Sequence, residues 1–137
     1  MKANLMPICT NLLAFAYWLY LLDPLKSKPQ IRRYKSLLET KNALVTHLLV
    51  ATFFALFAML LIINKEQRDI FSFIPLLFII LVVAFNKICR YRYHRDFHLV
   101  IRGDRLKTSW FDKLASILAL ILPLLANIFI CILFTKN

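Results

Sequence analysis

The chain has 137 residues, enough for one domain, and 61% of them are hydrophobic, which is more than a soluble domain of this size can bury. Its formal net charge is +11, but the charges are clustered rather than spread along the sequence. This combination is typical of an integral membrane protein whose basic loops face anionic lipid, and we expect no nucleic-acid partner. A single glycine and three scattered cysteines exclude a glycine-rich phosphate loop, a disulfide scaffold and a cysteine zinc site of the usual spacing.

The first expected element is a transmembrane helix over residues 4–22. A basic loop follows over residues 23–42 and contains six lysines and arginines. Within this loop four apolar residues recur on one face of a helix: Ile31, Tyr34, Leu37 and Leu38. The stripe predicts either a short amphipathic helix at the level of the lipid headgroups or the start of the next membrane helix.

Three further spans are expected after this loop. The second covers residues 43–63, which contain no formal charge and are long enough to cross a hydrocarbon layer of roughly 30 Å. A polar outer turn at 64–69 leads to the third span at 70–88, and the fourth span covers 114–134. The apolar stretches of all four spans lack Asp, Glu, Lys and Arg, the usual markers of proton and ion pathways in membranes.

A second long basic loop covers residues 89–113. From Cys89 to Ile101 apolar and polar residues largely alternate, and a period of two is typical of a strand. Gly103-Asp104 suits a type II′ turn between strands at 97–102 and 105–110. The sequence therefore predicts a short cytosolic β-hairpin here, with the alternative that the third helix runs on past Lys87.

The distribution of charge predicts the orientation. Fourteen of the eighteen Lys and Arg residues lie in the two long loops, residues 23–42 and 87–113. The positive-inside rule places these loops in the cytosol and both termini outside. We therefore expect an all-α integral membrane protein with four transmembrane helices, in the bacterial inner membrane or a comparable energised membrane.

The basic loops supply candidate sites for anionic lipid headgroups. Lysine and arginine near such a surface are each attracted by roughly 1 kcal/mol. The candidate headgroup residues are Arg32, Arg33, Lys35, Arg90, Arg92 and Arg95.

Three polar residues are expected inside the membrane: Asn11, His47 and Asn127. By helix rise, Asn11 and Asn127 lie at similar depth, where an unpaired amide is unfavourable. We therefore expect the first and fourth helices to pack together with both amides hydrogen-bonded in the bundle interior. We expect His47 to reach back to the headgroups or to hydrogen-bond another helix.

The sequence contains no pattern that predicts a catalytic residue, a cofactor or a metal site. The function expected from it is non-enzymatic: an accessory, assembly or immunity-type protein that contacts another membrane protein through its helices and acts through its basic loops. The alternative is a small transporter, a holin-like pore component or a membrane-embedded enzyme with a pocket between helices.

Overall fold

The computed structural model of the protein describes residues 5–26, 32–63, 71–101 and 109–135. The described chain contains five helices and no strand: α1 (Leu5–Leu22), α2 (Tyr34–Glu39), α3 (Lys41–Ile63), α4 (Ile74–Tyr93) and α5 (Trp110–Thr135). Helices α1, α3, α4 and α5 are long and apolar enough to cross a membrane. The predicted all-α class with four candidate spans is confirmed.

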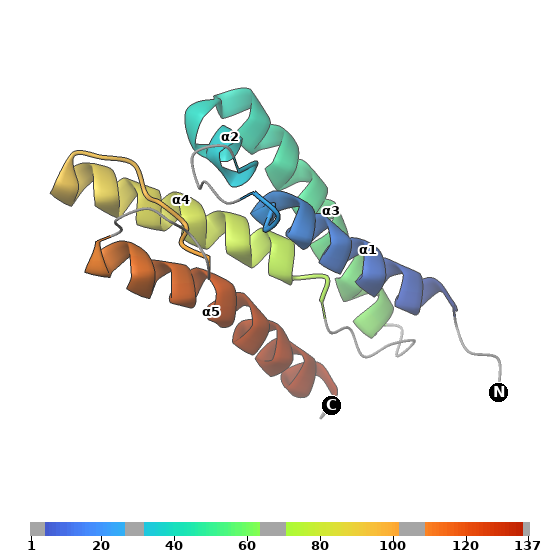
Figure 1. Cartoon of the computed structure of the whole chain (residues 1–137). Coiled ribbons are helices and arrows are strands. Elements are labelled where there is room, and N and C mark those ends of the chain that lie inside the picture. Colours follow the sequence, from blue (N-terminus) through green and yellow to red (C-terminus); the bar gives the residue numbers. More distant parts are fainter. Residues whose placement is uncertain (1–4, 27–31, 64–70, 102–108, 136–137) are drawn as a thin grey trace.

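The long helices extend beyond their apolar stretches at one end of the molecule. There α3 already begins at Lys41, α4 runs on to Tyr93, and α5 begins at Trp110. We call this the basic end; the end of α1 and the whole of α2 also lie there, and the start of α1 lies at the opposite end (Figure 1). Several charged side chains of the loops expected from the sequence therefore belong to helices.

Helix α4 is the centre of the bundle and packs against all four other helices. It lies between α5 on one side and α1 and α3 on the other (Figure 1). Phe78 and Val82 of α4 are fully buried. Helix α3 approaches α4 through Ala51, Ala55 and Ala58, which are buried at helical spacing, because small side chains allow two helices to pack closely.

Helix α2 is separate from α3, because Thr40 between them is extended, with φ −120° and ψ 119°. Tyr34 and Leu37 are buried in the main core, so the apolar face of α2 packs on the bundle. Of the two alternatives, the structure has the short helix, and a position at the level of the lipid headgroups stays a prediction. Ile31 lies outside the described residues.

The predicted β-hairpin is not supported. Residues 96–101 are extended but belong to no strand, and Trp110 begins α5. Gly103 and Asp104 lie outside the described residues. The extended residues have no free N–H groups for a ladder at 97–100, because helix side chains accept those hydrogen bonds. The third span instead continues past Lys87, as in the alternative.

Candidate functional site

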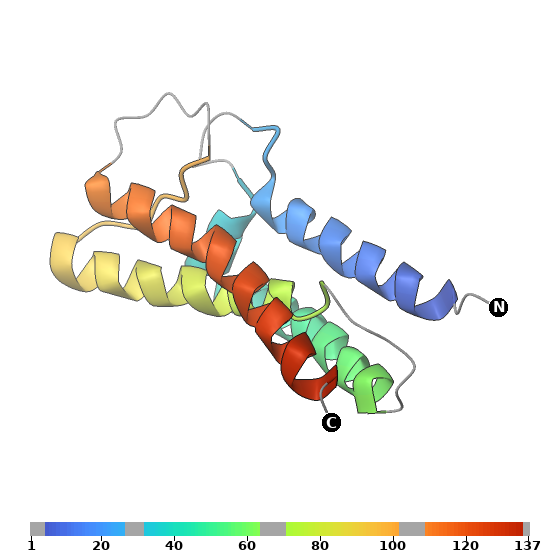
Figure 2. The ribbon, with the colours of Figure 1, turned by 90° about the horizontal axis from the view of Figure 1, so that it is seen from below.

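After α4 the chain reverses and runs back along the bundle as an extended segment, residues 94–101, which we call the return segment (Figures 1 and 2). The reversal occurs at His94, whose φ of 50° is left-handed and ends α4. Phe97 and Leu99 are fully buried, and the Phe97 ring packs on Phe85 with 5.9 Å between centroids. The return segment is therefore part of the core at the basic end.

Four successive main-chain N–H groups of the return segment each donate a hydrogen bond to a helix side chain. The pairs are Phe97 with Asn86 Oδ1 (2.9 Å), His98 with Asp112 Oδ1 (3.4 Å), Leu99 with the Tyr34 hydroxyl (2.9 Å) and Val100 with Ser116 Oγ (2.7 Å). The acceptors come from α2, α4 and α5. Because a buried N–H without a partner is unfavourable, these side chains make the extended path possible.

Three carbonyl groups of the segment, those of Asp96, His98 and Leu99, also accept hydrogen bonds from side chains. Leu99 accepts a hydrogen bond from Arg32 Nη1 (3.0 Å), and Arg32 Nε donates to the carbonyl of Lys26 (3.0 Å). Arg32 is only 3% exposed. Its guanidinium thus ties the connection between α1 and α2 to the return segment.

Asp112, in the first turn of α5, carries the first charged cluster of this region and is 1% exposed. Its carboxylate forms an ion pair with Arg95 at 2.8 Å and accepts a hydrogen bond from the Ser109 hydroxyl (3.1 Å). Ser109 Oγ in turn accepts the main-chain N–H of Asp112 (3.2 Å), so Ser109 caps the N-terminus of α5. The negative charge also lies where the helix dipole favours it.

Asp96 carries the second charged cluster. Arg90 Nε donates to its carboxylate at 2.7 Å, and Lys35 Nζ of α2 lies 4.0 Å away. The hydrogen bond from Arg90 lowers the pKa of Asp96, and the hydrogen bond to Asp112 raises the pKa of Arg95. Each interaction therefore stabilises the charged form, the carboxylate of Asp96 and the guanidinium of Arg95.

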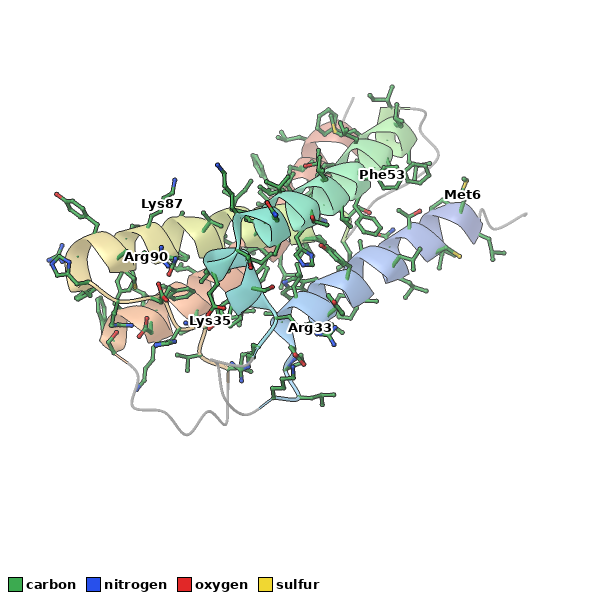
Figure 3. All side chains as sticks on the ribbon, turned by 90° about the horizontal axis from the view of Figure 1, so that it is seen from above. Met6, Arg33, Lys35, Phe53, Lys87 and Arg90 are labelled. Atoms are coloured by element: carbon green, nitrogen blue, oxygen red, sulfur yellow. The ribbon has the colours of Figure 1, made fainter. Side chains whose placement is uncertain are left out.

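The six candidate headgroup residues do not share one exposed face. Arg32 and Lys35 are buried, and Arg95 turns inward to its ion pair. Arg33 is exposed and stacks on the Tyr20 ring, 3.9 Å from its centroid. Figure 3 shows how Arg33, Lys35 and Arg90 lie around α2.

Arg92, the sixth candidate, is exposed near the end of α4. Contact with lipid headgroups stays a prediction for all six residues. The structure adds that at least Arg32 and Arg95 hold the return segment in place.

The two asparagines that are expected inside the membrane bind one turn of main chain. Asn11 Oδ1 accepts the N–H of Phe71 (2.9 Å), and Asn127 Oδ1 accepts the N–H of Phe73 (3.3 Å). Both amides are therefore bonded at similar depth. The prediction that the first span packs on the fourth is wrong, because α4 lies between α1 and α5. Each amide instead binds main chain that leads into α4.

His47, the third polar residue that is expected inside the membrane, lies in α3. Its Nδ1 is 2.6 Å from the Tyr17 hydroxyl of α1. Of the two expectations for this histidine, the structure has the hydrogen bond to another helix. The contact joins α1 to α3 near the basic end.

His98 is the titratable group of the return segment with an unsatisfied nitrogen, because its Nδ1 is buried without a hydrogen-bond partner in the described structure. Burial, and next the positive charge of Lys35, lower the pKa of His98, while Asp112 opposes this. Arg95 lowers the pKa and Asp96 raises it. Within the described ranges no three His, Cys, Asp or Glu side chains are grouped so that they could hold a metal ion.

Two apolar grooves that are lined by described residues run between helices. One of about 470 Å³ lies between α4 and α5 and is lined by Leu77, Ile80, Leu81, Leu122, Pro123, Leu125, Ala126 and Phe129. The other, of about 290 Å³, lies between α3 and α4 and has Lys87 at one end of its lining.

Sequence reasoning did not identify Asn86, Asp112 and Ser116 as residues that organise this region. One signal was present: Ser109-x-x-Asp112 directly before an apolar run is a capping-box pattern, which predicts that the helix begins there. Asn86, a single amide in an apolar run, was a weaker signal.

No protein-family model, curated protein or solved structure matches the chain.

Proposed function

We propose that this is a non-enzymatic accessory protein of a bacterial inner membrane or a comparable membrane, of the assembly or immunity type. It acts through contacts between its helices and those of another membrane protein, and through its basic end on the cytosolic side. The orientation follows from the fourteen Lys and Arg residues of the two long loops.

The observation that carries the proposal is that polar side chains in the bundle bind the chain's own backbone. Asn86, Tyr34, Asp112 and Ser116 accept hydrogen bonds from the chain's own backbone, and Arg95 neutralises Asp112. These side chains fix the conformation of the basic end, and their hydrogen-bonding groups are used for that purpose. A shape held at the basic end favours recognition of a partner over chemistry on a substrate.

The outward face of α3 is the surface through which we propose contact within the bilayer. Large apolar side chains are exposed there at alternating spacings of four and three: Leu49, Phe53, Leu56, Leu60 and Ile63. This spacing presents one continuous face, and a partner helix can pack along it.

Photo-crosslinking in native membranes tests this contact. A photoreactive residue at Phe53 or Leu56 is expected to capture one membrane protein, whereas the same residue at Leu12 or Leu13 on α1, which is equally exposed, is expected to capture mainly lipid. Equal capture from both helices would argue against a specific partner on α3. A reporter after residue 137 and cysteine labelling at positions 28 and 105 test the orientation, and a cytosolic C-terminus contradicts it.

The second candidate function is that of a small transporter, a pore component or a membrane-embedded enzyme. The groove between α4 and α5 favours it, because an interhelical cavity is where such proteins bind small molecules. Solute or ion flux in vesicles containing the purified protein, lost when Ala126 is replaced by Phe to fill the groove, would support this candidate over the first.

A further inference from the structure

We propose that the groove between α3 and α4 holds an acyl chain of an anionic phospholipid whose phosphate lies against Lys87 and Lys41. The proposal goes beyond the function given above, because it requires only that the helices lie in a bilayer. The side chains that line the groove are Leu44, Leu48, Ile79, Ile80, Val83, Ala84 and Lys87.

The size of the groove fits a section of lipid chain. Its volume is about 290 Å³. A methylene group is close in size to a water molecule, which occupies about 30 Å³ in the liquid, so the groove has room for about ten methylene groups.

The charge lies at one end of this groove. Lys87 is exposed and lines it, and Figure 3 shows its side chain extending away from Arg90 and Lys35. Lys41 lies one helical turn before Leu44 and two turns before Leu48, so the three share a face of α3. Helix α3 begins at the basic end and α4 ends there, which brings both lysines to the same end of the groove.

Neither Lys41 nor Lys87 has an ion pair with any described residue, whereas Lys35, Arg90 and Arg95 each have a carboxylate partner. Lys87 lies thirteen residues after the start of α4, about 20 Å along the helix. At this depth its long apolar stem can lie beside the groove while its ammonium group reaches the headgroup layer.

An apolar groove with two ammonium groups at one end fits an amphiphile with a negatively charged headgroup. A free phosphate would make no favourable contact with the apolar walls of the groove. A purely apolar partner helix would form no ion pair with the ammonium groups. The larger groove between α4 and α5 is lined by apolar side chains alone, so it does not distinguish one apolar occupant from another.

Photoreactive lipids test the proposal on the purified full chain in nanodiscs. Phosphatidylglycerol and phosphatidylcholine carry the same photoreactive acyl chain in parallel samples. We expect several-fold more adducts near Leu48 and Ile80 with phosphatidylglycerol. Each of Lys41→Gln and Lys87→Gln is expected to lower the apparent affinity for phosphatidylglycerol about fivefold, whereas Lys113→Gln, which removes an exposed cation from α5, is expected to leave it unchanged.

Equal adduct yields with the two lipids would overturn the proposal, as would equal effects of Lys87→Gln and Lys113→Gln. Ala84→Phe gives an independent readout, because Ala84 is exposed in the groove and a ring there fills it. We expect this variant to lower adduct formation by both lipids at Leu48 and Ile80. Unchanged adducts in Ala84→Phe would place the acyl chain elsewhere and refute the site.

Discussion

Replacing Asp112 by Ala is the most informative perturbation of the basic end. The change removes the partner of Arg95, the acceptor of the His98 N–H and the acceptor of the Ser109 hydroxyl. Removal of one member of a buried ion pair costs about 3–5 kcal/mol of unfolding free energy. The Arg95 side chain is 32% exposed and water can solvate part of it, so we expect the lower end of this range, about 3 kcal/mol.

Unfolding in mixed detergent micelles, followed by circular dichroism, measures this loss. Asp96→Asn is the matched control, because Asp96 is 34% exposed and its closer partner Arg90 is 56% exposed, and exposed pairs contribute about 1 kcal/mol or less. The double change Arg95→Met with Asp112→Leu is expected to be milder than Asp112→Ala, because no charge is left buried and unpaired. If Asp112→Ala destabilises no more than Asp96→Asn, the ion pair does not hold the return segment and the reasoning fails.

Three further predictions concern individual hydrogen bonds and pH. Tyr34→Phe removes the acceptor of the Leu99 N–H and is expected to lower the unfolding free energy by about 1–3 kcal/mol; no loss in the same detergent assay would show that this N–H finds another partner. Asn11→Leu and Asn127→Leu are each expected to cost a similar amount, and their effects should add in the double variant because each amide serves a different main-chain N–H; a double variant milder than either single change would mean that the amides bind each other. The lowered pKa of His98 means that the unfolded chain takes up a proton near pH 6.5 before the folded one does, so the unfolding midpoint should fall as the pH drops from about 7.5 to about 5.5, and it should fall less in His98→Gln.

The four long helices could be predicted from the sequence because the bilayer sets a length that few other structures need. A run of about twenty apolar residues suits a membrane helix, and four such runs are present. The ends of the helices could not be placed in the same way. Polar residues can continue a helix in or out of lipid. Asp112 and Ser109 were therefore assigned to a loop, whereas Asp112 lies in the first turn of α5 and Ser109 caps that turn.

The return segment shows where pattern reading fails. Alternating residues at 97–101 indicate extended backbone, and the structure has extended backbone there. The pattern does not reveal what satisfies the N–H groups, and a partner strand is the commonest answer. Here the partners are side chains eleven to sixty-five residues away in sequence, from Asn86 to Tyr34.

The prediction of what Asn11 and Asn127 bind failed for a related reason. Helix rise gave Asn11 and Asn127 a common depth, and both do bind at one level, the turn that contains Phe71 and Phe73. Equal depth does not fix which neighbours a helix has, because that depends on how the bundle is arranged around α4. The sequence therefore supplied the need for a hydrogen bond but not the group that meets it.

An extended segment within a helical bundle is physically permitted only when protein atoms satisfy its backbone, since lipid offers no hydrogen bonds. In this protein the four acceptors of the return segment come from α2, α4 and α5, so its path depends on all three helices being in place at once. A movement of any one of them exposes an N–H group of the buried segment, which opposes independent motion. The basic end is therefore held as one unit, with Lys41 and Lys87 on its border and available to a ligand.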